Sequence, residues 1–214
     1  MSEKQNTSLS TTGSVIDFHN MLQRSEEWHN IRIGRVGGSE AIGLTTPARM
    51  KTMAYSKLGE LLSGEQKAIK PNEAMQRGID LEPMAKEMYE QEEMVSVDEV
   101  GYITNSFYKY MGLSPDGLVG NVGAVEIKCP SSAKHVKTII ENVVPKEYIP
   151  QIVTYFLVNE DIQWVDFISY DDRIKRLPYY RIRLNRLDLL DEINSLSENY
   201  TKYENIINEH LKLF

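Results

Sequence analysis

The 214-residue chain has a single cysteine, Cys129, so it cannot form an internal disulfide. Its four histidines are scattered and show none of the spacings of zinc-binding motifs. Long apolar runs are also absent: the longest, over residues 149–158, contains a proline, a glutamine and a threonine and is far shorter than the roughly 20 residues of a membrane span. These absences argue against a disulfide scaffold, a zinc site and a membrane protein.

Positive charge is scarce as well. The chain has 24 lysines and arginines against 31 aspartates and glutamates, and its formal net charge is −7. Because affinity for phosphates comes mainly from accumulated basic side chains, this balance argues against a surface that coats nucleic acid indiscriminately. It still allows a local basic channel beside a carboxylate-lined metal site. The motifs must therefore indicate the function.

The first 14 residues are polar and lack the apolar stretch and the small-residue cleavage site of a secretory signal. We expect a disordered tail over residues 1–14 and a cytoplasmic, intracellular protein. Residues 15–214 contain no repeat, low-complexity block or linker, and 41% of the chain is hydrophobic, which is enough for one sizeable core. We predict that residues 15–214 form a single domain.

The order of expected elements predicts the fold class. Ser25 is placed to cap a first helix, and Ser39 a short second one after a glycine-rich turn. Helices are expected over residues 53–62 and 72–92, although Pro83 should kink or interrupt the latter. Three consecutive strands (95–104, 108–113 and 122–129), helices from Ser131 and over 146–159, two strands (162–170 and 179–184) and a final helix (187–211) follow. This order predicts an α/β (α+β) fold with a mixed central β-sheet flanked by helices.

The segment SPDGLVGNVGAVEIKCP, residues 114–130, combines an acid in a turn with an acid and a lysine two residues apart. Because side chains on a strand alternate faces, Glu126 and Lys128 should share one face while Val125 and Ile127 enter the core. A hairpin through the glycines at 120 and 123 can bring Asp116 back beside them. Two carboxylates would then converge with an ammonium, and such hard oxygen ligands, with the Ile127 carbonyl as a further candidate, select magnesium or manganese.

These groups predict phosphodiester hydrolysis, in which a metal-bound water attacks phosphorus and Lys128 positions or deprotonates that water. Each short motif alone is weak evidence, since Pro-Asp-Gly turns and Glu-x-Lys pairs on edge strands are common structural features. A second Glu-x-Lys at residues 65–67 lies in a polar loop without β-branched neighbours or an upstream Pro-Asp, so we discard it. The combination of both motifs across a predicted hairpin carries the prediction.

With these motifs in order, the chain resembles the lambda-exonuclease branch (YqaJ-type viral recombinases) of the PD-(D/E)xK nucleases. The resemblance covers about residues 25–185. It rests on W-H-x-x-R at 28–32, G-S-E at 38–40, G-x-x-x-E at 78–82, SPDG at 114–117, EIKCP at 126–130 and the pair at 148 and 151. It implies a restriction-endonuclease-like core. It also implies processive 5'→3' digestion of one strand of linear double-stranded DNA, which leaves 3' single-stranded overhangs for recombination by strand annealing.

The resemblance assigns one group of residues to metal binding and chemistry. Asp116, Glu126 and the Ile127 carbonyl would bind metal, and Glu82 would help to hold a second ion from its helix. Lys128 would activate the water. Two Mg²⁺ ions per active site are implied, with Mn²⁺ as a substitute.

A second group of residues matches the 5'-phosphate and DNA contacts of the family: Arg32, Ser39, Ser114, Gln151 and Met75. The first four match the pocket for the terminal phosphate, and the methionine matches an apolar wedge. An arginine on an amphipathic helix and a serine at a helix cap are also ordinary structural features, so those alternatives stay open.

Other assignments have structural alternatives too. Glu82 lies among several glutamates, so a solvated helix face is open to it, and Met75 has a spacing usual for core residues. Trp28 is expected to pack in the core rather than stack on DNA, and Cys129 to be a small buried strand residue rather than a nucleophile. Gly37 stands where the family pattern has a hydroxyl residue.

The resemblance further implies a ring-shaped homotrimer acting on DNA with a 5'-phosphorylated end in a bacterial host. Its expected partner is a phage-type single-strand annealing protein. Because a catalytic core does not encode dependence on DNA ends, a restriction-like or repair endonuclease of the same fold is an alternative. A non-catalytic DNA-binding recombination scaffold is another, although the acidic residues and the lysine are all intact.

Overall fold

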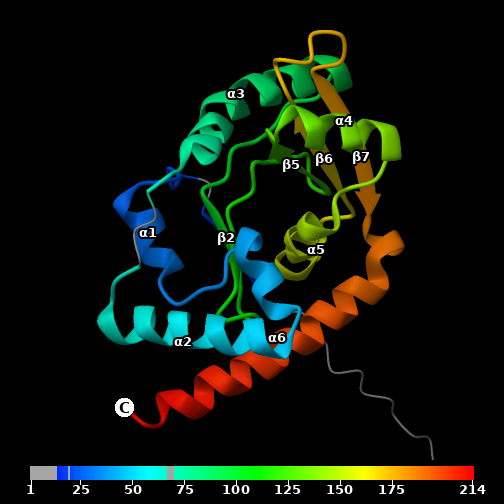
Figure 1. Ribbon diagram of the computed structural model, residues 1–214. Coiled ribbons are helices and arrows are strands. Elements are labelled where there is room, and N and C mark those ends of the chain that lie inside the picture. Colours follow the sequence, from blue (N-terminus) through cyan, green and yellow to red (C-terminus); the bar gives the residue numbers. More distant parts are fainter. Residues whose placement is uncertain (1–13, 19, 67–69) are drawn as a thin grey trace, which may run out of the picture.

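The chain folds into two β-sheets covered by helices, as the computed structural model of residues 14–18, 20–66 and 70–214 shows (Figure 1). The predicted tail lies outside these residues except for Ser14. The elements are β1 (Val15–Phe18), α1 (Glu26–Arg32), η1 (Gly38–Leu44), α2 (Pro47–Ser63), α3 (Glu73–Glu93), β2 (Tyr102–Asn105), β3 (Gly112–Leu113), β4 (Gly117–Val119), β5 (Gly123–Lys128), α4 (Ser132–Glu141), η2 (Lys146–Tyr148), α5 (Ile149–Val158), β6 (Trp164–Tyr170), β7 (Tyr179–Asn185), η3 (Arg186–Leu189) and α6 (Leu190–Leu211).

The larger sheet has the order β4-β5-β6-β7 and is mixed, as predicted. β4 and β5 form an antiparallel hairpin, β5 and β6 run parallel, and β6 and β7 are antiparallel. The parallel pair requires a crossover, which α4, η2 and α5 supply. The fold class is confirmed: an α/β (α+β) fold in which helices flank a mixed sheet.

The prediction of three consecutive strands in one sheet is wrong. β2 and β3 pair with β1 in a separate antiparallel sheet, and β5 belongs to the larger one. Residues 95–100 form no strand except for one bridge between Asp98 and Leu118. Val97 and Val100 are buried without strand pairing, and the Val97 backbone N–H donates to the Glu90 side chain at 2.8 Å instead of to a neighbouring strand.

Helix ends follow the predicted caps with one exception. Ser25 and Ser131 accept backbone N–H groups at the starts of α1 and α4. Ser39 does not cap η1, which begins one residue earlier after Gly37, so the serine lies inside the helix and is exposed. Pro83 does not interrupt α3, because buried Leu81 and Ala85 on either side of the proline anchor one continuous helix.

Two hydrophobic clusters hold the larger sheet between its helices. The first includes Val165 and Phe167 of β6 and residues of α5 and α6. The second lies on the opposite face, where Val125 and Ile127 pack with residues of α3. The predicted entry of Val125 and Ile127 into the core is thus confirmed. Within the described residues, no helix has the length and apolar character needed to cross a membrane.

Candidate active site

The β4–β5 hairpin brings together the acids and the lysine of the central motif. Asp116 lies just before β4, and its Oδ2 accepts the backbone N–H of Ile127 at 2.6 Å. Glu126 is fully buried in β5, and its Oε1 lies 2.5 Å from Nζ of Lys128. The predicted convergence of two carboxylates and an ammonium is therefore present in the structure.

Burial and neighbouring charges shift the pKa values of Asp116 and Lys128. Burial raises the pKa of Asp116 well above its usual range, and the neighbouring Glu126 carboxylate raises it further. Burial lowers the pKa of Lys128, but the Glu126 and Asp116 carboxylates outweigh this effect and the net shift is upward. Lys128 is thus held as an ammonium, while Asp116 resists ionisation in its buried position beside Glu126.

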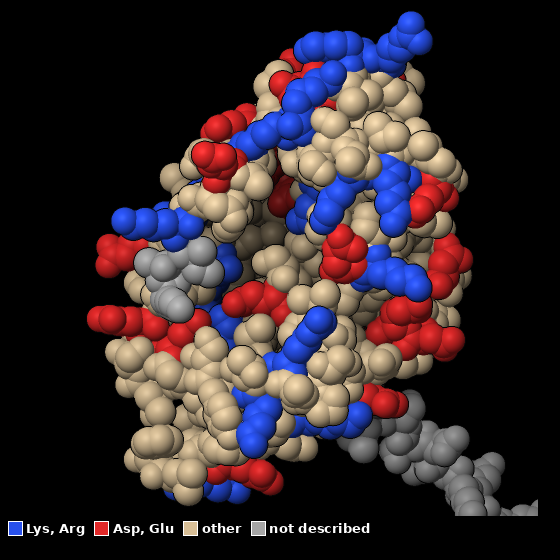
Figure 2. Space-filling model, viewed as in Figure 1, with Lys and Arg blue, Asp and Glu red and all other residues tan. Residues whose placement is uncertain are grey.

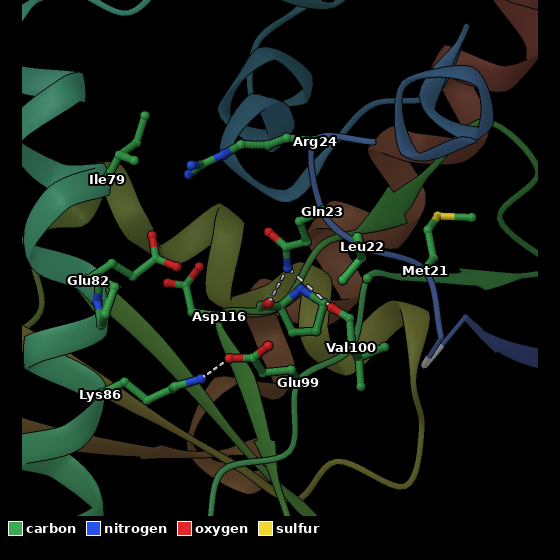
Figure 3. A pocket seen from close by; sticks show the side chains of 13 residues that line it. Met21, Leu22, Gln23, Arg24, Ile79, Glu82, Lys86, Glu99, Val100 and Asp116 are labelled. Atoms are coloured by element: carbon green, nitrogen blue, oxygen red, sulfur yellow. Dashed lines mark hydrogen bonds and ion pairs between the residues drawn. The ribbon is translucent and has the colours of Figure 1, made fainter. Parts of the chain in front are cut away.

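Glu82 reaches the same place from α3. It lines a cavity of about 410 Å³ together with Asp116 and residues of the segment before α1. Figure 3 shows the Glu82 and Asp116 carboxylates pointing toward each other, with Arg24 extending into the same space from the opposite wall. Burial raises the pKa of Glu82, partly offset by the charge of Arg24. Glu82 therefore belongs to the acidic cluster and does not lie on a solvated helix face.

Two residues of the cavity, Gln23 and Arg24, were not predicted. The Gln23 side chain donates to the backbone carbonyls of Pro115 at 2.9 Å and Val100 at 3.2 Å, so it holds the chain next to Asp116 (Figure 3). Arg24 has a left-handed backbone with φ of 71°, which is uncommon for a residue other than glycine. No sequence pattern marks either residue, because both act through contacts with segments far away in the chain.

A third unpredicted residue, Tyr155 of α5, contacts both acids. Its hydroxyl lies 2.8 Å from Oε2 of Glu126 and accepts the backbone N–H of Asp116 at 3.3 Å. Burial and the Glu126 carboxylate raise the pKa of Tyr155 well above its usual range, so the hydroxyl keeps its proton. Its position four residues after Gln151, and so on the same helix face, is the one signal that could have suggested it.

Arg32, Ser114 and Gln151 lie near the start of η1, the helix whose second residue is the fourth predicted phosphate-pocket residue, Ser39. The Arg32 guanidinium carbon lies 3.8 Å from the centre of the Trp28 ring, and Trp28 Nε1 donates to Oγ of Ser114 at 2.7 Å. A Cβ added at Gly38 would lie 3.4 Å from the Gln151 side chain, which therefore packs directly on the backbone of η1. Arg32, Ser114 and Gln151 thus approach one another through Trp28 and η1.

Gly37 lies beside Arg32 at the start of η1. A Cβ there would make ordinary contacts, 3.5 Å from Glu40 Oε2 and 3.6 Å from an Arg32 guanidinium nitrogen, so the space at this position does not require a glycine. The Gly37 backbone N–H binds Glu40 Oε2 at 2.9 Å. The other Glu40 oxygen pairs at 3.0 Å with the buried ammonium of Lys57, which fixes the start of η1 to α2.

Other residues considered from the sequence fall outside the core or outside the site. Trp28 is half-buried and belongs to neither hydrophobic cluster, so its expected core packing is wrong. Met75, in the first turn of α3, is 46% exposed, which contradicts a core role. Burial raises the pKa of the Cys129 thiol to about 12, which disfavours the nucleophilic thiolate.

The donor set fits a hard divalent cation. Within the described part of the chain, Glu126 Oε1 is buried with only the Lys128 ammonium beside it, and the pKa of Asp116 is raised first by burial and further by the Glu126 carboxylate, whose repulsion a cation would relieve. Across residues 14–18, 20–66 and 70–214, no three His, Cys, Asp or Glu residues converge closely enough to hold an ion by themselves. Asp116 and Glu126 would therefore share an ion with water and substrate oxygens, as is usual for magnesium.

Charge is distributed unevenly around this region. The face in Figure 2 is hollowed near its centre, with acidic atoms at depth and both basic and acidic side chains around the opening. The basic side chains beside the hollow could guide a phosphate backbone to a carboxylate site even though the chain as a whole is acidic.

Comparison with known proteins gives consistent relatives. Residues 27–161 match the family described as the YqaJ-like viral recombinase domain. Among curated proteins, no sequence matches the chain. The crystal structure of an alkaline exonuclease (LHK-Exo) from Laribacter hongkongensis is 35% identical, with a TM-score of 0.74 over 89% of this chain and 100% of that one. LHK-Exo in complex with dAMP is 38% identical, with a TM-score of 0.77 over 88% and 96%. A phage-related exonuclease from Haemophilus somnus 129PT, 14% identical with a TM-score of 0.56 over 84% and 96%, shares the fold.

Proposed function

Because the chain belongs to the YqaJ-like viral recombinase family, in the lambda-exonuclease-like branch of the PD-(D/E)xK nucleases, we propose that this nuclease is a 5'→3' exonuclease. Its substrate is linear double-stranded DNA, of which it digests one strand processively to leave 3' overhangs for strand annealing. The observation that carries the proposal is the convergence of Asp116, Glu126 and Lys128 beside an open cavity. The relative LHK-Exo was crystallised in complex with dAMP, which supports a nucleic-acid substrate for this chain.

The cofactor in this proposal is Mg²⁺, two ions per site, with Mn²⁺ as a substitute. Asp116, Glu126 and the Ile127 carbonyl would hold one ion, and Glu82 would help to hold the other. The bound metal supplies a Lewis acid for the phosphoryl oxygens and lowers the pKa of bound water. The oxygen donors of Asp116, Glu126 and Glu82 support this choice over a softer metal.

Lys128 has a defined role in this scheme. As an ammonium held beside Glu126 it donates hydrogen bonds, so it positions the attacking water or stabilises negative charge on the phosphate oxygens. Proton abstraction by Lys128 requires that the two carboxylates, which keep it charged, be neutralised first.

The direction of digestion depends on Arg32 in this proposal. A guanidinium can bind a terminal phosphate through two parallel charge-assisted hydrogen bonds, and Ser114 and Gln151 lie close enough to contribute polar groups. Ser114 is two residues from Asp116, which places this pocket next to the acids. Each cut exposes a new 5' phosphate that can enter the pocket and draw the duplex forward. Ser39 is exposed on η1, where it can add a hydroxyl, and exposed Met75 is free to act as the wedge.

The test is digestion of three duplexes: linear with a 5' phosphate, linear with a 5' hydroxyl, and closed circular. We expect rapid loss of the first, slower loss of the second and survival of the circle, with Mg²⁺ or Mn²⁺. Calcium should allow binding with little cleavage because its looser coordination positions water poorly, and excess chelator should stop the reaction. Cleavage of the circle would instead favour an endonuclease of the same fold, and turnover in chelator would refute the metal requirement.

For the assembly, we propose a closed homotrimer that encircles the DNA product, with a phage-type single-strand annealing protein as partner. A ring keeps the enzyme on its substrate between cuts and so explains processivity. Sedimentation at working concentration should give a trimer. A monomer that digests processively in a trapping assay would refute the ring.

A further inference from the structure

The Tyr155 hydroxyl is a hydrogen-bond partner shared by the two acidic residues of the hairpin. It lies on α5, is fully buried, and is 2.8 Å from Oε2 of Glu126. The backbone N–H of Asp116 points to the same oxygen at 3.3 Å, and the Val125 carbonyl oxygen lies 3.2 Å away. One oxygen atom of α5 thus contacts both arms of the β4–β5 hairpin.

The Tyr155 hydroxyl has one proton and two possible acceptors, the Glu126 carboxylate and the Val125 carbonyl. The proton can be donated to only one acceptor at a time, and the shorter contact, to the Glu126 carboxylate, is charge-assisted and therefore stronger. The lone pairs remain available to the Asp116 N–H. The hydroxyl therefore fixes the rotamer of Glu126 and the backbone position of Asp116 together.

The fixed rotamer has a consequence for the other Glu126 oxygen. With Oε2 bound to Tyr155, Oε1 is the oxygen that lies 2.5 Å from Lys128 Nζ and accepts no hydrogen bond of normal geometry. Rotation of Glu126 would exchange these two oxygens or withdraw both. Tyr155 thus keeps Oε1 turned toward Lys128 and the acidic cluster, where the lysine is its one polar partner in the described residues.

Core packing alone does not require a hydroxyl at this position. The buried neighbours of Tyr155 on α5 are apolar apart from Thr154, whose hydroxyl donates to the Pro150 carbonyl, and a phenylalanine would fill nearly the same volume as the tyrosine. Burying a hydroxyl costs free energy unless its hydrogen bonds compensate, and these bonds go to the acidic hairpin. The same helix places Gln151 one turn earlier against η1, so α5 contacts both the acidic cluster and the phosphate pocket.

We propose that Tyr155 is a positioning residue that sets the geometry in which Glu126 and Asp116 bind the divalent cation. This inference rests on the metal-dependent nuclease function proposed above. It assigns no proton transfer to the tyrosine and no contact with DNA.

The test is Tyr155→Phe in the full chain. Outer-shell partners of metal ligands typically account for 10- to 100-fold in metal affinity or activity, so we expect the half-saturating Mg²⁺ concentration to rise by about that factor. Mn²⁺ binding to the DNA-free protein, measured by calorimetry, should weaken by a similar factor. At limiting Mg²⁺ the cleavage rate of Tyr155→Phe should fall by the same factor on 5'-phosphate and 5'-hydroxyl ends, because the phosphate pocket is unchanged. At high Mg²⁺ the rate should recover.

Tyr200→Phe is the matched control. Its hydroxyl is also buried and accepts the Tyr110 backbone N–H at 2.8 Å, so the substitution removes a buried tyrosine hydrogen bond in α6, away from the acids. We expect it to lower the melting temperature without changing Mn²⁺ affinity. Tyr155→Met, which also fills the site without a hydroxyl, should show the same loss of Mn²⁺ affinity and replaces Tyr155→Phe in the comparison if the phenylalanine variant does not fold.

The outcomes separate this inference from the proposed function. Wild-type Mn²⁺ affinity in Tyr155→Phe, or a loss no larger than that of Tyr200→Phe, would overturn the positioning role. A wild-type protein that binds Mn²⁺ in a Tyr155-dependent way but digests no DNA would overturn the nuclease proposal and leave the positioning role standing.

Discussion

Two fully buried carboxylates lie on neighbouring strands of the larger sheet, and their surroundings differ sharply. Asp166 of β6 receives four hydrogen bonds, from the two arginines Arg181 and Arg183 and from the hydroxyl of Tyr89, at 2.7–3.3 Å. Glu126 of β5 receives one hydrogen bond from a tyrosine and one ion pair from a lysine, and it leaves Oε1 without a hydrogen bond. The two carboxylates are equally buried, but Asp166 accepts hydrogen bonds on both oxygens, whereas Glu126 accepts one from the described residues, on Oε2 only.

The register of the two strands explains the difference. Asp166 is paired with Val125, and Glu126 with Phe167, so the two acids point to opposite faces of the sheet. Asp166 faces α3, where the arginines of β7 neutralise it. Glu126 faces α5, close to a second carboxylate. A buried acid whose oxygens are all engaged holds the fold together, whereas an incompletely engaged acid beside a like charge is available for a cation.

The largest effect is expected from substitutions in the acidic cluster, and it should be on catalysis. Glu126→Gln, Asp116→Ala and Lys128→Ala should each reduce single-turnover cleavage by at least about 100-fold and leave a folded protein, because each removes a metal ligand or the group that handles water. Circular dichroism and cleavage of 5'-phosphorylated linear duplex measure the two properties. Near-normal cleavage by any of the three would remove that residue from the active site.

Asp166→Asn should have the opposite pattern of effects: it should lower the stability of the protein and leave cleavage nearly unchanged. The amide cannot accept both arginines as the carboxylate does, and we expect the free energy of unfolding to fall by about 2 to 3 kcal/mol. The loss stays below the range for a fully buried pair because both guanidinium groups reach solvent. Urea denaturation measures it. Cleavage well below the melting temperature should stay within about twofold of wild type, and a loss comparable to that of Glu126→Gln would erase the distinction.

The acids and the lysine of the active site could be predicted from the sequence, but the residues that surround them could not. Glu126 and Lys128 follow from the two-residue period of a strand and Asp116 from a short hairpin, which are local relations. The 95–100 segment was mistaken for a strand because its buried apolar residues look the same whether they pair or form a loop. Tyr155 and Gln23 reach the hairpin from segments 39 and 92 residues distant from their partners, and no local period encodes such contacts.

A smaller effect is expected from a substitution in the phosphate pocket, which should change the preference for DNA ends more than it changes the chemistry at the acidic cluster. Arg32→Ala should cost about 1.5 to 3 kcal/mol of transition-state stabilisation on 5'-phosphorylated ends, the range for hydrogen bonds to a charged group, and much less on 5'-hydroxyl ends. The ratio of kcat/KM on the two ends measures it. Arg49→Ala, which removes an exposed arginine from α2, is the control and should leave the ratio unchanged. Equal slowing of both ends by Arg32→Ala would make Arg32 a general DNA or structural contact.

The smallest expected effect concerns the stability cost of crowding two acids. Because the pKa of Asp116 is raised in the folded protein, the folded state holds a proton at pH values where the unfolded chain has lost it. Stability from this group is therefore present below the ordinary carboxyl range and is lost as the pH rises toward the raised folded pKa. At neutral pH and without metal, ionised Asp116 destabilises the fold, which is the opposite of the effect of a carboxylate neutralised by arginines.

Asp116→Asn should therefore stabilise the metal-free protein while it abolishes cleavage. We expect a gain of about 0.5 to 2 kcal/mol in the free energy of unfolding at neutral pH, as is common when an unfavourable charge is removed. The gain should shrink as the pH falls into the ordinary carboxyl range, where the wild-type side chain is protonated in both states. Denaturation in chelator across this pH range measures it, and added Mg²⁺ should narrow the difference by stabilising the wild type alone. A variant less stable than wild type at neutral pH would show that the Asp116 hydrogen bond to the Ile127 N–H outweighs the repulsion between the acids.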